Sequence, residues 1–368
     1  MKLTVYDKYI FKQVFFTTFV SILLFTVVWI APEMLLKTIK AVLEGEYTPL
    51  TGVKLLTCQL PLIFSKAFPV GLLLGSLFTF DKLSKDSELT IFRAVGMPFR
   101  RIVAPVVVLS LFVTVLCFVT IDKLVPYASA IISHIKDRNP SSQYIYTQKD
   151  KSGKPTLAVV VSKYNKKGMK NVLVIDFVDS EYTDMHGISD IYVAKKGKFH
   201  PDKWALTDIT HYKISSEGIF NNISHIDSMN ILEGHLASDL HLMMRYSTKK
   251  EREITNKNLW KYIHLLKTVK NDEETYSLML SKYYQRFFHP MICILLAIMG
   301  CLLGFSKPRE QRMVGFGIAI GAIFLYYITL PFFDLLAEKL VLPPLITALV
   351  PPLTFLGCIV AFYKSRDL

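Results

Sequence analysis

The sequence predicts a membrane-embedded α-helical protein with a large all-β domain in the middle of the chain. Three observations indicate this: 51% hydrophobic residues with only 20% charged, six long apolar stretches, and a polar, alternating segment between the third and the fourth stretch. Soluble domains average about 25% charged residues and lack apolar runs of about 18 residues or more. The composition therefore excludes an ordinary soluble enzyme, a disordered protein and a small disulfide-rich secreted domain.

Each apolar stretch is long enough to cross the roughly 30 Å hydrocarbon core as a helix rising about 1.5 Å per residue. The first is too long for a cleaved signal peptide, and no small-x-small cleavage site follows it. The second is interrupted only by Lys66. The six predicted membrane-spanning helices are Val14–Pro32, Cys58–Phe80, Ile102–Ile121, Phe287–Ser306, Met313–Phe333 and Leu340–Tyr363.

The distribution of Lys and Arg predicts the orientation. With a cytoplasmic N-terminus, the inner segments carry thirteen of these residues and the short outer loops carry four. Because short cytoplasmic loops are enriched in Lys and Arg, both termini are expected inside and segment 122–286 outside. The inner segments are 1–13, 81–101, 306–312 and 363–368, and the outer loops are 37–54 and 334–342.

Segment 122–286 has the pattern of β-structure. Short β-branched or alternating stretches are separated by predicted turns at Lys151-Ser152-Gly153, Lys167-Gly168 and Lys196-Gly197. This spacing favours a sandwich or a jellyroll. The predicted strands are Pro155–Val161, Val172–Val178, Asp190–Ala194, Trp204–Thr210 and His211–Ser216.

From about Thr255 the period becomes helical, since Leu259, Ile263, Leu266 and Val269 share one face. The predicted domain order is therefore 1–121 with helices one to three, 122–286 with the external β domain and its helical C-terminal part, and 287–368 with helices four to six.

A short charged helix, about 84–96, is predicted on the cytoplasmic side between the second and third spans. Asp86 is a suitable N-cap, Glu88 lies in the first turn where the helix dipole favours an acid, and Gly96 ends the helix. Leu89 and Phe92 share a face. Two interpretations remain open: an interfacial helix that ties two spans together, or a coupling helix that docks on a cytoplasmic ATPase.

Lys66 is the one formally charged residue well inside a predicted span. Burying an unpaired ammonium group there costs about 2.5–3.5 kcal/mol, so Lys66 should snorkel or face a wet cavity or an anion; we favour the cavity. With Lys37, Lys40 and Lys54 it could form a basic rim at the outer mouth that binds lipid phosphates. Snorkelling to phospholipid headgroups is the alternative for the other three lysines.

The sequence contains no Walker A, HExxH or G-x-S-x-G motif, and its five cysteines have the positions of apolar packing residues. We therefore expect no catalytic residue, no metal and no cofactor, and energy must come from a partner. His289, beside Pro290, is expected to be a packed histidine. No nucleic-acid partner is expected, because the predicted external domain lacks aromatic–basic interleaving.

Three pairs of glycines spaced four residues apart permit close helix approach. Packing within one subunit is the expected role, and a subunit interface is the alternative. The pairs are Gly71/Gly75, Gly300/Gly304 and Gly317/Gly321.

Several motifs carry a resemblance to a known family. They are Leu83-Ser84-Lys85-Asp86-Ser87-Glu88-Leu89-Thr90 with Arg93-Ala94-Val95-Gly96, Pro69-Val70-Gly71-Leu72-Leu73-Leu74-Gly75, His289-Pro290 with Gly300-Cys301-Leu302-Leu303-Gly304, and Val341-Leu342-Pro343-Pro344. Essentially the whole chain resembles the LptF/LptG (YjgP/YjgQ) permeases of lipopolysaccharide export.

The resemblance implies a multi-pass permease subunit in the bacterial inner membrane with a periplasmic β-jellyroll. It implies three kinds of protein partner: an LptB-type ATPase dimer, a second permease (as an LptF/LptG heterodimer or a homodimer) and an LptC-like protein. It also implies that lipopolysaccharide is extracted and passed to a periplasmic bridge towards the outer membrane. Glu88 would couple to the ATPase, with Leu89, Phe92 and Arg93 as supporting contacts.

Two other functions remain open. The chain could be the permease of another ABC-type lipid or lipoprotein extruder, or a non-transport membrane receptor or assembly factor with an external β domain. The receptor or assembly factor predicts no ATPase partner, whereas both transporters require one.

Overall fold

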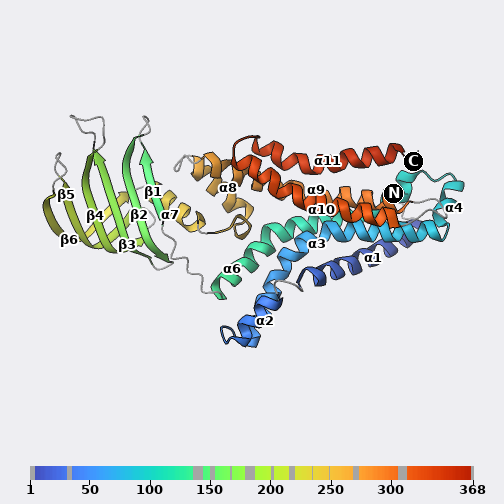
Figure 1. Ribbon diagram of the computed structural model, residues 1–368, viewed down its shortest axis with the longest axis horizontal. Coiled ribbons are helices and arrows are strands. Elements are labelled where there is room, and N and C mark those ends of the chain that lie inside the picture. Colours follow the sequence, from blue (N-terminus) through green and yellow to red (C-terminus); the bar gives the residue numbers. More distant parts are fainter. Residues whose placement is uncertain are drawn as a thin grey trace. The chain divides into compact units, whose positions relative to one another are not determined.

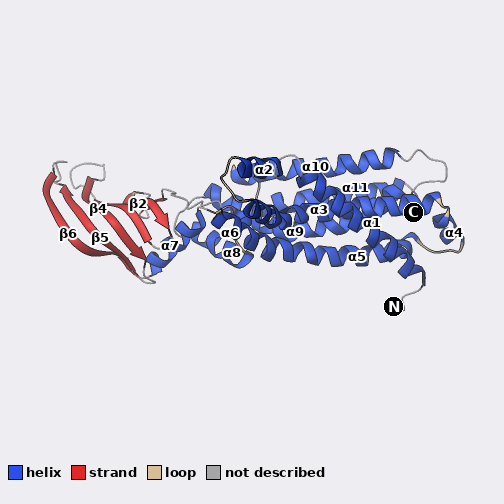
Figure 2. Cartoon of the chain, turned by 90° about the horizontal axis from the view of Figure 1, so that it is seen from below, coloured by secondary structure: helices blue, strands red, loops and turns tan. Residues whose placement is uncertain are grey.

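The computed structural model describes residues 5–30, 35–135, 144–149, 154–165, 168–178, 187–199, 203–214, 220–233, 235–247, 249–267, 273–305 and 313–365. The chain divides into two compact units. The first comprises Met1–Ile135 with Ser277–Leu368, and the second comprises Lys136–Tyr276. The first unit is helical, and the second contains the β-sheet (Figure 1, Figure 2).

In the described residues, six helices are long and apolar enough to cross a membrane, and each predicted span falls on one of them. These helices are α1 (Val5–Ile30), α3 (Pro49–Lys85), α5 (Phe99–Val119), α9 (Glu273–Gly304), α10 (Met313–Glu338) and α11 (Pro344–Ser365). Two shorter helices lie between consecutive spans, α2 (Leu36–Leu43) and α4 (Glu88–Ala94), and α5 is continued by the π-helical turn η2 (Thr120–Leu124) and α6 (Val125–Ile135).

Helix α3 and helix α9 form the centre of the helical unit. One buried cluster joins them to α1, α4 and α5, and a second joins them to α10 and α11. Glycines permit this close packing: a Cβ atom on Gly300 would lie 2.4 Å from the carbonyl oxygen of Leu73, and one on Gly75 would lie 2.5 Å from Cα of Thr18. The expected intramolecular role of the first two glycine pairs is confirmed.

The third span continues beyond its predicted end at Ile121. The π-helical turn η2 carries Asp122 and Lys123, and α6 then extends the helix to Ile135. A π-turn keeps the chain helical while shifting its hydrogen-bond register, so two charged residues did not end the helix.

The second unit contains one six-stranded antiparallel sheet, in which every strand pairs with its neighbour in sequence. This meander differs from the predicted jellyroll, whose strands are joined by crossing Greek-key connections. The strands are β1 (Tyr144–Lys149), β2 (Pro155–Asn165), β3 (Gly168–Val178), β4 (Gly187–Phe199), β5 (Lys203–Ile214) and β6 (Phe220–Glu233). They are followed by α7 (His235–Ser247), the 3₁₀ turn η3 (Glu251–Glu253) and α8 (Asn256–Leu265).

The predicted turn at Lys196-Gly197 is wrong, because both residues lie inside β4. Gly197 is needed there for space: a Cβ atom would lie 2.7 Å from the Leu206 side chain and 3.0 Å from that of Met169. The turns predicted at 151–153 and at Lys167 lie outside the described residues.

Two predicted strands, Trp204–Thr210 and His211–Ser216, are one strand, β5, as far as residue 214. Asp208 has a left-handed backbone (φ 57°) and shifts the inward-facing positions from Leu206 to Ile209. Asn171 of β3 also has a left-handed backbone (φ 51°) and shifts the inward-facing positions of that strand from Met169 to Val172. The alternation of inward-facing and outward-facing side chains therefore shifts by one residue within each of these continuous strands.

Helix α8 confirms the predicted helical period, since Leu259, Ile263 and Leu266 are all buried. The fourth residue of that face, Val269, lies outside the described residues.

Candidate functional site

The predicted short helix after the second span is present as α4, joined to α3 by only Asp86 and Ser87. Its N-cap is Ser87, not the predicted Asp86, because Asp86 still caps the C-terminus of α3. Gly96 ends the helix as predicted, with a φ of 83°.

The C-terminal hydrogen bonds of α4 form a Schellman motif. The N–H of Gly96 donates to the carbonyl of Arg93 at 2.9 Å, and the N–H of Met97 donates to that of Phe92 at 3.1 Å. The short helix therefore has a well-defined end.

One face of α4 is anchored in the helical unit. Leu89 is 2% exposed, and Phe92 packs edge-on against Tyr6 with ring centroids 4.6 Å apart. The guanidinium group of Arg93 lies over the Phe305 ring, 5.6 Å from its centroid. Leu89 and Phe92 therefore hold α4 in place rather than presenting their side chains outward.

Glu88 is tied to the first helix: its Oε1 accepts a hydrogen bond of 2.9 Å from the Tyr9 hydroxyl. Arg101 of α5 forms an ion pair of 2.7 Å with Asp7, which also lies on α1. The start of α1 therefore contacts the elements on both sides of the turn at Gly96.

The outward face of α4 carries two apolar residues that sequence reasoning missed. Ile91 is 59% exposed and Val95 is 77% exposed. They are four residues apart and hence on one helical face, opposite Leu89. This spacing was visible in the sequence, but it does not tell which of the two apolar faces is buried.

Lys66 lies in a turn of α3 that Pro69 loosens. Proline has no N–H, so the carbonyl of Ser65, four residues earlier, loses its helical partner. The ring of His289 supplies a substitute, with Nε2 3.4 Å from the Ser65 oxygen. Because that oxygen only accepts, Nε2 carries the proton, and Nδ1 accepts from the Tyr326 hydroxyl at 2.6 Å.

A second tyrosine holds the next carbonyl: the Tyr327 hydroxyl donates to the backbone oxygen of Lys66 at 2.8 Å. Helices α9 and α10 thus fix the backbone on which the intramembrane lysine is carried. The prediction that His289 is a packed histidine is consistent with these contacts.

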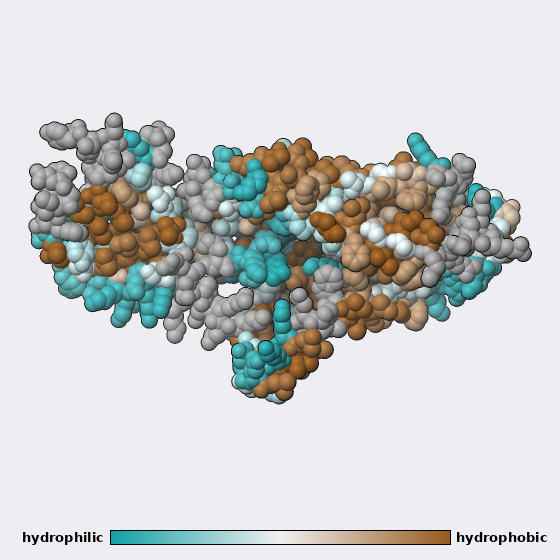
Figure 3. All heavy atoms as spheres, viewed as in Figure 1, coloured by the Kyte–Doolittle hydropathy of each residue, from teal (hydrophilic) through white to brown (hydrophobic). Residues whose placement is uncertain are grey.

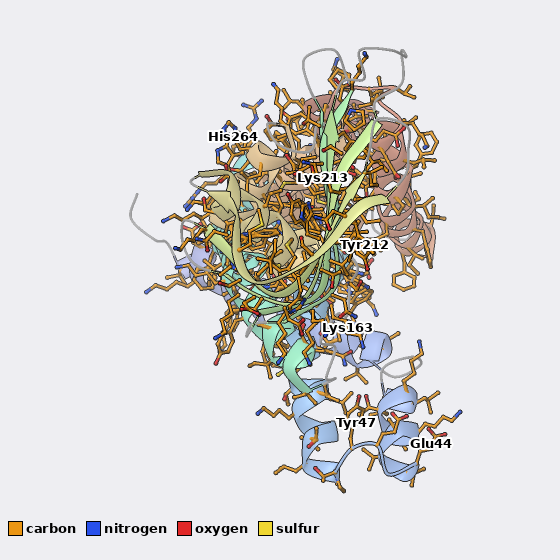
Figure 4. All side chains as sticks on the ribbon, turned by 90° about the vertical axis from the view of Figure 1, so that its left-hand side faces the viewer. Glu44, Tyr47, Lys163, Tyr212, Lys213 and His264 are labelled. Atoms are coloured by element: carbon orange, nitrogen blue, oxygen red, sulfur yellow. The ribbon has the colours of Figure 1, made fainter. Side chains whose placement is uncertain are left out.

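The four lysines of the predicted basic rim do not form one cluster. Lys37 and Lys40 lie on α2 and Lys54 on the first turns of α3, at an exposed helical hairpin. Figure 4 shows Glu44 and Tyr47 at the turn of this hairpin. Lys66 follows Lys54 by twelve residues, which is about 18 Å along the helix axis.

Lys40 is also paired with Glu44, the residue that caps the C-terminus of α2, at 3.6 Å, although both side chains are largely exposed. Exposed pairs of this kind contribute little to stability. Lys40 therefore remains accessible to an anion in spite of the pair.

The two faces of the sheet differ. One face is buried, with Val159, Val174, Ala194 and Leu206 at 2% exposure or less. The other face carries two adjacent apolar rows that cross the sheet, and Figure 3 shows a hydrophobic area over the strands. The rows are Ile145, Val160, Leu173 and Val193, and Ala158, Ile175, Ile191, Tyr212 and Ile223.

A Ser–His–Asp grouping lies on the sheet, but it has no catalytic geometry. His211 Nε2 is 2.7 Å from Asp190 Oδ1, and Nδ1 is 3.3 Å from the Ser224 hydroxyl. These three residues are neighbours on adjacent strands, and the ring nitrogens are paired in the opposite sense to a catalytic triad, in which Nε2 faces the serine and Nδ1 faces the aspartate. Burial and the nearby Asp190 raise the pKa of Asp176, as expected for a polar patch on a packed sheet.

Residues 8–365 match the model of a protein family described as lipopolysaccharide export system permease LptF/LptG. A comparison with curated proteins found no match.

Proposed function

The chain belongs to the lipopolysaccharide export system permease LptF/LptG family, and we propose that it is one permease subunit of an ABC transporter that extracts lipopolysaccharide from the inner membrane. The observation that carries the proposal is the extent of the match, which covers residues 8–365 of 368 and so includes both the apolar helices and the sheet. Members of this family are membrane subunits of a transporter, not catalytic enzymes.

In this proposal α4 is the coupling helix for a partner ATPase dimer. It is short, bounded at both ends and anchored by Leu89, and it presents exposed Ile91 and Val95. Exposed apolar residues ringed by polar ones suit docking on another protein. Glu88 acts at the junction of α4 with α1, because it holds the Tyr9 hydroxyl.

The lysines bind the phosphates of lipopolysaccharide at two levels. Lys37, Lys40 and Lys54 form an outer group, and Lys66 receives an anion deeper in the membrane-spanning region. Ammonium groups pair with phosphate as point charges, and an intramembrane lysine is favoured when an anion compensates it.

The partly exposed apolar rows of the sheet carry the acyl chains towards the periplasmic bridge. An extended apolar face of a sheet outside the membrane is costly in water, and acyl chains would cover it. An LptC-like protein is the expected next carrier.

A second permease of the same family completes the transporter. Its contact is proposed at Gly317 and Gly321 of α10, since a Cβ atom on either would meet no described atom within 4 Å. This glycine pair therefore packs no other part of the described chain and is open to a neighbouring helix. With both termini cytoplasmic, the chain would make three crossings, a periplasmic domain and three further crossings.

The proposal is tested by purifying the tagged chain from solubilised membranes and identifying its companions and bound lipid by mass spectrometry. We expect an ATPase subunit, a permease of the same family and lipid A. A different bound lipid together with an ATPase would assign another extruder, and the absence of any ATPase would favour a receptor or assembly factor.

A further inference from the structure

A pocket of about 390 Å³ opens between the first turns of α1 and the last turns of α3. This volume falls in the range of about 300–1,000 Å³ that is usual for small-molecule sites. The polar part of its lining consists of Tyr9, Lys12, Gln13, Thr17, Thr79 and Lys82.

The floor of the pocket is closed by hydroxyl groups. Those of Thr17 and Thr79 lie 2.6 Å apart, and they approach the carbonyl oxygen of Gly75 at 3.0 and 2.8 Å. Because these groups satisfy one another, the floor is rigid and contributes no free hydrogen-bonding group to a ligand.

The rim of the pocket is positively charged. Lys12 and Lys82 contribute one ammonium group from each helix, and no carboxylate belongs to the described lining. Both lysines are exposed. A ligand with net negative charge is therefore favoured over a neutral or cationic one.

One side-chain oxygen of the residues that line the pocket lacks a hydrogen-bond donor. The Oε1 atom of Gln13 is buried and has no hydrogen-bond partner among the described residues. Tyr9 lines the pocket beside Gln13, but its hydroxyl already donates to Glu88 and so has no proton left for this oxygen. The amide carbonyl is left as an acceptor for a ligand that carries an O–H or N–H group.

The pocket lies where the helices change from polar to apolar. Lys12 comes just before the first uncharged stretch, and Lys82 comes just after the second. In a membrane this boundary is the level of the lipid headgroups. From there Phe16 and Val20, 66% and 44% exposed, extend along α1 into the apolar part of the helix.

We propose that this pocket binds the headgroup of phosphatidylglycerol. Its phosphodiester lies between Lys12 and Lys82, a glycerol hydroxyl donates to Oε1 of Gln13, and an acyl chain follows Phe16 and Val20. Phosphatidylethanolamine fits less well, since its ammonium group cancels the net charge and is repelled by the lysines. The site is separate from the lysines proposed for the cargo, and it requires only that the chain lies in a membrane.

The charge requirement is tested on the purified full-length chain by native mass spectrometry with added phosphatidylglycerol or phosphatidylethanolamine. We expect phosphatidylglycerol to bind more tightly, and the double variant Lys12→Gln/Lys82→Gln to lose affinity by about tenfold. The matched control Lys85→Gln/Lys364→Gln removes the same charge from exposed positions outside the pocket and should bind like the unmodified chain. Equal binding of the two lipids, or equal losses in both double variants, would overturn the proposal.

The donor requirement is tested with phosphatidylmethanol, which has the same phosphodiester charge but no hydroxyl group. We expect the unmodified chain to prefer phosphatidylglycerol by about fivefold, and Gln13→Met to abolish that preference while keeping the dependence on the lysines. An unchanged preference in Gln13→Met would overturn the assigned contact. Loss of bound phosphatidylglycerol when the chain is purified with a second membrane subunit would show instead that the pocket is a protein interface.

Discussion

At the scale of single residues, the clearest feature is that α4 has an anchored face and an exposed face. Leu89 and Phe92 are packed, whereas Ile91 and Val95 face outward. Substitutions on the two faces should therefore have different consequences. Truncating a buried leucine costs about 2–5 kcal/mol of stability, whereas exposed positions tolerate change.

We expect Ile91→Ala and Val95→Ala to leave the amount of protein in the membrane unchanged but to weaken association with the ATPase, measured by co-purification. Leu89→Ala should instead lower the amount of folded protein. If both exposed variants retained full ATPase binding and full transport, α4 would be an interfacial linker.

Glu88 needs a control of its own, because its carboxylate bonds Tyr9. Glu88→Ala removes the carboxylate and the bond, whereas Tyr9→Phe removes only the bond. We expect Glu88→Ala to uncouple ATP hydrolysis from lipid release more strongly than Tyr9→Phe. Alanine is a good helix former, so α4 should persist. Equal effects would restrict Glu88 to holding α1 against α4.

Lys66 is expected to contact the anionic lipid. A photo-crosslinker at position 66 should label lipopolysaccharide, whereas one at Ile318 of α10 should not. Lys66→Glu should reduce lipopolysaccharide release more than Lys66→Arg, because only the first reverses the charge. Equal transport by the two variants would mean that Lys66 merely snorkels to the headgroups.

At the scale of elements, the glycine pairs separate packing within the chain from packing between chains. We expect Gly300→Ala and Gly304→Ala to destabilise the helical unit, because the added Cβ atoms would lie 2.4 and 2.6 Å from backbone oxygens of α3. Gly317→Ala and Gly321→Ala meet no described atom and should favour helix, since alanine exceeds glycine by about 1 kcal/mol in propensity.

The same α10 variants should nevertheless weaken pairing with a second permease, because close helix approach requires small residues. Thermal stability of the single chain and co-purification of the second permease are the two measurements. Unchanged pairing in Gly317→Ala and Gly321→Ala would place this face of α10 against lipid.

The elements differ in how well the sequence predicted them. The six apolar helices were predictable because membrane insertion depends on local composition, and the end of α4 was predictable because Gly96 is a local signal. Strands β1 and β6 were missed. The Asn221-Asn222 pair in β6 has low β propensity, and the strand is stabilised by pairing with β5.

The contacts of the candidate site could not be predicted, because they join distant parts of the chain. His289 lies 224 residues from Ser65, and Glu88 lies 79 residues from Tyr9. No local sequence pattern around either residue predicts its partner. The charge of Lys66 and the proline three residues later were visible in the sequence, but the hydrogen bond from Tyr327 to the Lys66 backbone came only from the fold.

At the scale of the whole molecule, helix α3 connects the proposed lipid-binding residues with the proposed coupling helix. It begins at Pro49, carries Lys54 and Lys66, and ends at Lys85, three residues before Glu88. At 37 residues it is about 55 Å long, more than the roughly 30 Å hydrocarbon core. A movement of α4 driven by an ATPase would therefore reach the level of Lys66 along a single helix.

An ATPase in the cytoplasm can move α4 only if α4 is cytoplasmic and the sheet is periplasmic, so the proposed mechanism depends on the orientation of the chain in the membrane. The thirteen Lys and Arg residues of the inner segments, against four in the short outer loops, predict that orientation. A reporter that is active only in the periplasm should be active when it is fused after Lys151. A reporter that is active only in the cytoplasm should be active when it is fused after Pro308. The opposite pattern would put α4 beyond the reach of a cytoplasmic ATPase and Lys37, Lys40 and Lys54 at the inner surface, where they would meet phospholipid rather than exported lipopolysaccharide.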